Sequence, residues 1–212
     1  MMKILKNNRG FTLIEMISVM ALATVLIFVS GMVISVYFRR YKELNDYIDL
    51  QTEAMKCLDT IRNGYALGDG DQFYGVVNST KLELTGSAQT WNQATGIKAY
   101  PPTGSLIQGN DFIHFYLDRG VIKVRYAYNG MQSSSAKDLF PIRSQQDRMQ
   151  VTKFAVSDAN ATGSLLPLNV VETEDLAIIK VNLQARVLVR DAALPRNKVY
   201  KTVDFTTYMV RK

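Results

Sequence analysis

One acidic side chain, Glu15, lies inside an otherwise apolar stretch that runs from residue 11 to residue 38. No Lys, no Arg and no second acid occurs between Phe11 and Phe38. An ionised carboxylate in the apolar part of a bilayer costs about 2.5 kcal/mol or more, so such groups usually pair with a counter-charge or mark a functional position. Glu15 is therefore the first candidate for chemistry. We expect it to pair with a cation at low dielectric, where attraction between charges is strong.

Residues that usually carry catalysis are sparse in the rest of the chain. His114 is the only histidine, and it lies between Phe112 and Tyr116 in an alternating segment. No partner residues for a catalytic triad or a metal site can be assigned to it, so we interpret it as structural. The sequence contains no G-x-S-x-G elbow and no G-x-G-x-x-G or phosphate-loop motif. We therefore expect no enzymatic activity, no catalytic residue and no cofactor.

Two further features are also interpreted as structural. The segment DANATG, residues 158–163, resembles the first half of a calcium loop that starts at Asp158. Its twelfth position is Asn169 rather than the required glutamate, so we expect a solvated turn and no metal. Cys57 is the only cysteine, and the three-and-four spacing around it favours a small core residue over a reactive thiol.

The element that must position Glu15 is a long helix. From Met16 to Phe38 there are 23 residues without charge, and they would form about 34 Å of helix, enough to cross a hydrocarbon core of about 30 Å. Residues 1–10 carry Lys3, Lys6 and Arg9, which favour a cytoplasmic N-terminus. Gly10 precedes the apolar run, whereas a secretory signal peptide is cleaved after its apolar core, so cleavage at Gly10 would retain the helix.

The segment GFTLIEMI, residues 10–17, with Arg9 before it and the apolar run to Phe38 after it, resembles the prepilin-type cleavage and methylation motif. Type IV pilins, pseudopilins of type II secretion and pilin-like competence proteins share this motif. The resemblance implies that the prepilin peptidase cuts after Gly10 and methylates the new amino group of Phe11. It also implies that Glu15 is an assembly contact, whose carboxylate pairs with the Phe11 amino group of a neighbouring subunit.

The helix is expected to continue beyond the membrane to residue 62, with Asn63-Gly64 as its C-cap. Residues 39–62 are amphipathic, and this predicts a face that packs on a globular domain. The apolar positions of that face are Tyr41, Leu44, Ile48, Met55, Leu58 and Ile61.

Residues 63–212 are predicted to form an antiparallel β head of six or seven strands. The expected strands are 72–78, 81–86, 111–117, 121–129, 150–158, 176–190 and 198–212. Asp118-Arg119-Gly120 is expected to close a tight hairpin. The expected loops are 66–72, 86–110, 131–146 and 191–197, because these stretches are rich in Gly, Ser, Asn, Pro or other polar residues.

The predicted fold class is α+β with a pilin-like architecture. The predicted segments are a leader (1–10), a transmembrane and filament-core half-helix (11–38), an amphipathic half-helix (39–62) and the head (63–212). The resemblance implies a minor pilin or J-type pseudopilin in the bacterial inner membrane, with one span and a periplasmic head. Its partners would be other pilin or pseudopilin subunits, the prepilin peptidase and the inner-membrane assembly platform. Met32 stands near the place where many major pilins have a proline, which favours a minor subunit.

Two alternatives remain open at this point. One is a signal-anchored binding module or enzyme whose helix serves only as a tether and whose N-terminus stays uncut. The other is a competence-pilus subunit whose head contacts DNA. The net charge is +6, but half of it comes from the first ten residues, so no dense basic stripe supports nucleic acid as a partner. The sequence does not choose between pilus, secretion and competence machinery.

Overall fold

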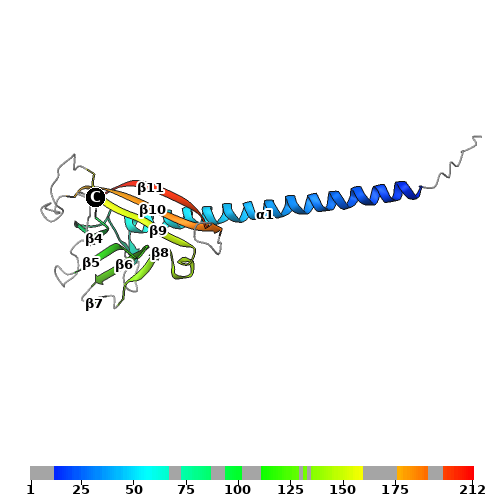
Figure 1. Ribbon diagram of the computed structural model, residues 1–212. Coiled ribbons are helices and arrows are strands. Elements are labelled where there is room, and N and C mark those ends of the chain that lie inside the picture. Colours follow the sequence, from blue (N-terminus) through cyan, green and yellow to red (C-terminus); the bar gives the residue numbers. More distant parts are fainter. Residues whose placement is uncertain are drawn as a thin grey trace, which may run out of the picture. The chain divides into compact units, whose positions relative to one another are not determined.

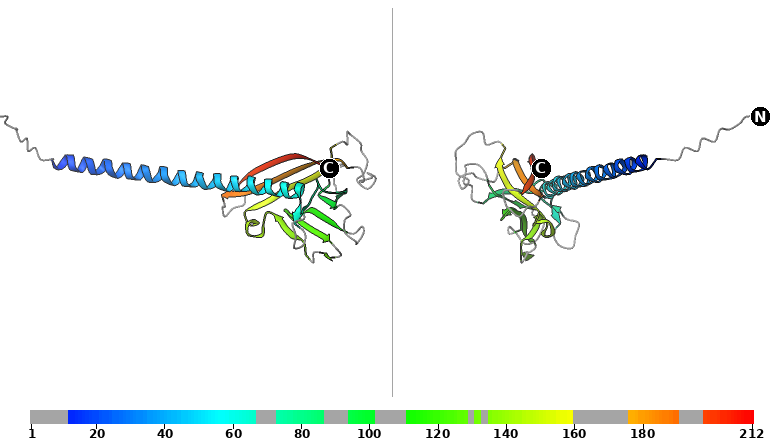
Figure 2. Two further views of the ribbon diagram at one scale, coloured as in Figure 1. Left: turned by 180° about the vertical axis from the view of Figure 1, so that it is seen from behind. Right: turned by 45° about the vertical axis from the view of Figure 1, so that its right-hand side comes forward.

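The computed structural model consists of one long helix followed by antiparallel strands, and this confirms the α+β, pilin-like fold class (Figure 1, Figure 2). The residues that it describes are 12–66, 73–86, 94–101, 111–128, 131–132, 135–159, 176–190 and 198–212. The chain divides into two compact units, residues 1–44 and 45–212, and helix α1 (Leu13–Asn63) contributes residues to both.

The described part of the first unit is helical and presents an apolar surface. Every side chain from Thr12 to Lys42 is exposed. The hydroxyl of Ser18 donates to the carbonyl oxygen of Ile14, and that of Thr24 donates to Met20, both at 2.8 Å. These hydroxyls are thus satisfied by the helix itself. Helix α1 is long and apolar enough to cross a membrane.

The other end of α1 is fixed by Gly64. The amide of Gly64 donates to the carbonyl oxygen of Thr60 at 2.9 Å, and Gly64 has a left-handed φ of 118°. A Cβ atom at this position would lie 2.5 Å from the backbone of Tyr74. Only glycine meets both conditions without strain. The predicted C-cap at Asn63-Gly64 is therefore confirmed.

The second unit combines residues 45–63 of α1 with three antiparallel sheets. The smallest pairs β1 (Tyr65–Ala66) with β2 (Phe73–Tyr74). A six-stranded sheet contains β3 (Lys81–Thr85), β4 (Gly96–Tyr100), β5 (Phe112–Asp118), β6 (Val121–Tyr128) and β7 (Met131–Gln132) in that order, with β8 (Lys137–Phe140) also paired to β6. The third has the order β11-β10-β9 and consists of β9 (Met149–Asp158), β10 (Ile178–Arg190) and β11 (Val199–Val210). A short 3-10 helix, η1 (Arg143–Gln145), precedes β9.

The predicted hairpin of β5 and β6 is confirmed. Arg119 and Gly120 both have positive φ, 50° and 81°, and Asp118 pairs with Val121 across the turn. Two left-handed residues match the twist of the flanking strands, as in type I′ hairpins. Ile113 and Phe115 alternate on the buried face of β5, which leaves His114 on the opposite face.

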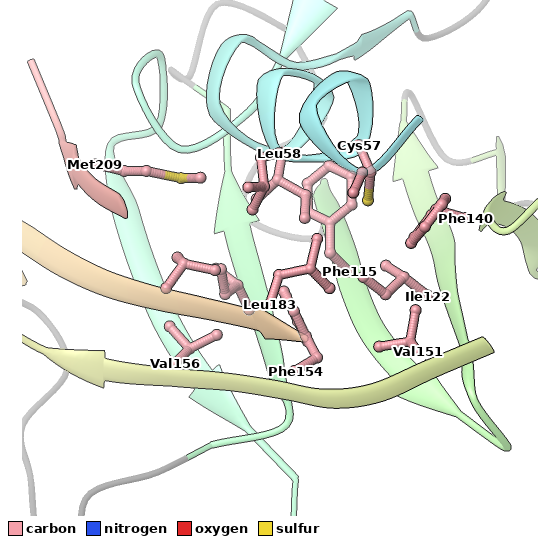
Figure 3. Packing of buried hydrophobic residues seen from close by; sticks show 14 of the residues in the cluster. Cys57, Leu58, Phe115, Ile122, Phe140, Val151, Phe154, Val156, Leu183 and Met209 are labelled. Atoms are coloured by element: carbon pink, nitrogen blue, oxygen red, sulfur yellow. The ribbon is translucent and has the colours of Figure 1, made fainter. Parts of the chain in front are cut away.

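The hydrophobic core lies between α1 and the two larger sheets. Figure 3 shows Cys57 and Leu58 of α1 together with core side chains of the strands, among them Phe115, Phe154 and Leu183. Cys57 is buried, as predicted, and burial raises the pKa of its thiol well above the usual range. We therefore regard Cys57 as a packing residue.

The predicted apolar face of residues 39–62 is partly wrong. Leu58 and Ile61 are buried, but four predicted members of the face are 46–55% exposed, namely Tyr41, Leu44, Ile48 and Met55. The side chains of this part of α1 that pack into the core are Leu50, Ala54, Cys57, Leu58 and Ile61. The three-and-four pattern gave weight to large apolar residues. The small side chains of Ala54 and Cys57 instead let α1 approach the sheets closely.

Three predictions for the strands are also wrong. β4 lies inside the stretch 86–110 that was expected to be a loop, and β7, β8 and η1 lie inside 131–146. Of the expected strand 72–78 only Phe73–Tyr74 forms a strand, β2, which pairs with β1, and β3 pairs with β4. The described residues thus contain eleven strands rather than six or seven. The predicted loop 191–197 and most of 66–72 lie outside the described residues.

Candidate functional site

The N-terminus of α1 is closed by a reciprocal set of hydrogen bonds between Thr12 and Glu15. The amide and the hydroxyl of Thr12 both donate to Glu15 Oε2, at 2.8 and 2.9 Å. The amide of Glu15 donates in return to Thr12 Oγ1 at 3.3 Å. The first helical bond follows directly, from the amide of Met16 to the carbonyl oxygen of Thr12 at 3.2 Å. Thr12 and Glu15 thus form a capping box.

The capping box determines the direction of the Glu15 carboxylate. Its bonds to Thr12 turn the side chain back towards the start of the helix instead of leaving it to extend outward. Oε1 forms no hydrogen bond with any described residue, so one oxygen remains available to a further donor. Gly10 and Phe11 lie outside the described residues, so their assigned roles stay predictions. Sequence reasoning missed Thr12, although T-x-x-E ahead of an apolar run is a recognisable signal.

We expect Thr12→Val to loosen the first turn of α1. Loss of an N-cap hydroxyl costs about 1 kcal/mol, which corresponds to a roughly fivefold change in a local equilibrium. The amides of Glu15 and Met16 should exchange with deuterium about fivefold faster in the full chain in detergent micelles. Thr12→Ser should restore protection, and Thr24→Val, which removes a hydroxyl from the same helix, should leave the first turn unchanged. Equal exchange in Thr12→Val and the unmodified chain would contradict the capping role.

Further along the first unit, the apolar surface of α1 has a shallow groove around Gly31. A Cβ atom at Gly31 would meet no atom within 4 Å, so the missing side chain leaves a notch. The residues that line the groove are Ile27, Phe28, Gly31, Met32, Ser35 and Val36. A notch of this kind lets the backbone of another helix approach closely.

The other candidates of the sequence do not assemble into a catalytic or metal centre in the described ranges. No three His, Cys, Asp or Glu side chains lie close enough there to hold a metal. Asp158 is at the end of β9, and residues 160–169 of the suspected calcium loop lie outside the described part. His114 lies on β5 with its Nε2 2.7 Å from Thr85 Oγ1, and no hydrogen bond among the described residues links its Nδ1 to an acid.

Comparison with protein families identifies the N-terminal segment. Residues 5–31 match the model of the prokaryotic N-terminal methylation motif, and this range contains Gly10, Phe11 and Glu15. Comparisons with curated proteins and with solved structures found no match. The motif is typical of type IV pilins and pseudopilins and indicates a pilin-like protein that is processed by prepilin peptidase and assembles with other pilin subunits. It is a motif of structural proteins rather than enzymes, and together with α1 it indicates membrane anchoring.

Proposed function

Because a prokaryotic N-terminal methylation motif leads directly into helix α1, we propose that this protein is a minor structural subunit of a type IV pilus or of a type II secretion pseudopilus. The observation that carries the proposal is the exposed apolar surface of α1 from Leu13 to Phe38. A surface of that extent is unfavourable in water and requires lipid or other helices around it. In a filament subunit the bilayer covers this surface before assembly, and the helices of neighbouring subunits cover it afterwards.

In this proposal the precursor enters the inner membrane with Lys3, Lys6 and Arg9 on the cytoplasmic side. Prepilin peptidase cuts after Gly10 and methylates the amino group of Phe11. The mature chain then consists of the filament-core half-helix (11–38), the amphipathic half-helix (39–62) and the periplasmic head (63–212). The inner-membrane assembly platform extracts it into the growing filament.

Glu15 fixes the register between subunits in this scheme. Cleavage creates a positive amino group at Phe11, one residue before the N-cap Thr12. The capping box directs the Glu15 carboxylate towards the helix start and leaves Oε1 available. At about 4 Å and an effective dielectric constant of about 20, two opposite charges attract by about 4 kcal/mol. That attraction favours the arrangement in which the Phe11 amino group of a neighbouring subunit reaches Glu15. An arrangement in which the neighbour is displaced by one helical turn lacks this attraction.

The groove around Gly31 supplies a second helix contact. Transmembrane helices associate mainly through close van der Waals packing, and glycine at the contact allows the backbones to approach. A side chain of a neighbouring α1 would fill the notch at Gly31. This contact depends on shape, whereas the contact of Glu15 depends on charge.

The minor role is supported by Met32 at the place where many major pilins have proline and by the large head. It predicts substoichiometric incorporation. Filaments sheared from cells and quantified by mass spectrometry should contain this chain at a few copies per filament, beside a far more abundant major subunit. Its detection as the bulk component would overturn the minor role, and its absence from filaments in cells that contain the mature chain would overturn the filament proposal.

A further inference from the structure

Three basic side chains lie in one cross-strand row on the outer face of the six-stranded sheet. Lys98 of β4 pairs in register with His114 of β5, and His114 pairs with Arg125 of β6. These strands are neighbours in the sheet (Figure 1). The buried residues of β4, β5 and β6 include Ile97, Ile113, Phe115 and Val124, so the row lies on the face opposite to the core. We call it the Lys98–His114–Arg125 row.

The row brings basic groups together without an acid between them. Directly opposite side chains of adjacent strands are about 5 Å apart at Cβ, so Lys98 and Arg125 flank His114 from both sides. Burial, Lys98 and Arg125 together lower the pKa of His114, with burial the largest cause. His114 is therefore neutral at pH 7. Two cations beside a neutral imidazole oppose its protonation, and a bound anion would relieve that cost.

Among the described residues, an acidic side chain offsets the positive charge of the row at the Lys98 end only. Glu83 of β3 faces Lys98 in register, with 3.9 Å between Lys98 Nζ and Glu83 Oε2. The same carboxylate also accepts a hydrogen bond from the Tyr100 hydroxyl at 2.6 Å. Arg125 is exposed and has no ion pair with any described residue. Two acids face Lys123 of β6 instead, since Asp118 Oδ2 lies 2.7 Å from Lys123 Nζ and Asp138 of β8 pairs with Lys123 in register.

The imidazole of His114 is held in a fixed position. Its Nε2 lies 2.7 Å from Thr85 Oγ1, and its ring stacks on Tyr116 with 4.7 Å between centroids. Nδ1 makes no hydrogen bond in the described part of the chain, so it remains available to a ligand. Such an arrangement reduces the entropy lost when a ligand binds.

The aromatic rings around the row are already covered. Lys98 Nζ lies 4.4 Å from the ring centroid of Phe112 and 5.0 Å from that of Tyr100. Tyr116 is stacked on His114. Proteins that bind single-stranded nucleic acid without sequence preference offer open aromatic faces to the bases, and this face does not. The groups that it offers are an ammonium and a guanidinium, which donate to oxygen anions, and an imidazole that donates at both nitrogens once it is protonated.

We propose that the Lys98–His114–Arg125 row binds a phosphate-type oxyanion, supplied either by a soluble phosphate compound or by the headgroup of an anionic lipid. Arg125 donates its planar fork to the oxyanion, Lys98 adds a point charge, and His114 becomes a donor at Nδ1 when it gains a proton. The site does not depend on the filament role of the chain.

His114 provides the readout, because it is the only histidine of the chain. The full chain, labelled with 15N at histidine, is placed in micelles of a neutral detergent and titrated with pH by NMR. Inorganic phosphate should raise the pKa of His114 by roughly one unit compared with chloride at equal ionic strength, because a nearby anion favours the imidazolium. The groups that face the imidazole and titrate or carry charge are Lys98, Arg125, Glu83, Lys123 and Tyr116.

Variants and lipids complete the test. Arg125→Gln should weaken phosphate binding at least about tenfold, whereas Lys180→Gln, the same change at an exposed site on β10, should leave it unchanged. A shift with inorganic phosphate identifies a soluble oxyanion. A shift that occurs only in nanodiscs of phosphatidylglycerol, and not of phosphatidylcholine, identifies the lipid headgroup. No shift in either arm, or equal losses in Arg125→Gln and Lys180→Gln, would overturn the site.

Discussion

Replacing Glu15 with alanine should leave membrane insertion and leader cleavage intact and reduce incorporation into filaments by at least about tenfold. A tenfold loss corresponds to only about 1.4 kcal/mol, well below the attraction expected between Glu15 and a Phe11 amino group at low dielectric. The measurement compares the amount of mature chain in sheared filaments with that in the membrane fraction. Ser18→Ala is the matched control, since its hydroxyl donates to a carbonyl of its own helix.

Glu15→Gln separates the two roles that the structure allows for this side chain. Glutamine also serves at the N3 position of a capping box, so this variant keeps the bonds to Thr12 and removes only the charge. If charge pairing between subunits is the function, Glu15→Gln should fail to assemble as completely as Glu15→Ala. Normal assembly of Glu15→Gln would assign Glu15 to helix capping alone, and normal assembly of Glu15→Ala would remove its role altogether.

Leu50→Ala should destabilise the head by about 2–5 kcal/mol, the usual range for a buried leucine. Leu50 is fully buried on the side of α1 that packs into the core. Met55, which is similar in size and belongs to the same helix, is 55% exposed, so Met55→Ala should change the stability by no more than about 0.5 kcal/mol. Urea titration of the full chains in detergent micelles, followed by near-ultraviolet circular dichroism, measures both. Equal losses in the two variants would contradict the assignment of the buried face.

Features that depend on neighbouring residues in the sequence could be predicted. The end of α1 was predictable because Gly64 supplies the left-handed conformation that the last turn needs. The β5–β6 hairpin was predictable because alternation and a turn with Gly120 occur within about twenty residues. Glu15 was identified because a charge in an apolar helix has few structural explanations.

Features that depend on distant partners could not be predicted. Asp46 is buried because it pairs with Arg148, about one hundred residues further along the chain, and a local pattern assigns it to the polar face. β4 is short and lies in a stretch with many loop residues, and its position is determined by β3 and β5. The Lys98–His114–Arg125 row appears only when three strands are placed in register. In each case the decisive contact joins segments that the sequence does not reveal as neighbours.

The most direct test of the central claim is the chemical identity of the mature N-terminus. The protein is isolated from the membrane fraction of its own cells, and its N-terminal peptide is sequenced by mass spectrometry. We expect a chain that begins at Phe11 with one methyl group on its amino nitrogen, and that keeps the full precursor start when Gly10 is replaced. A mature chain that begins at Met1 or Met2 would contradict the account and would favour a signal-anchored protein whose helix is only a tether.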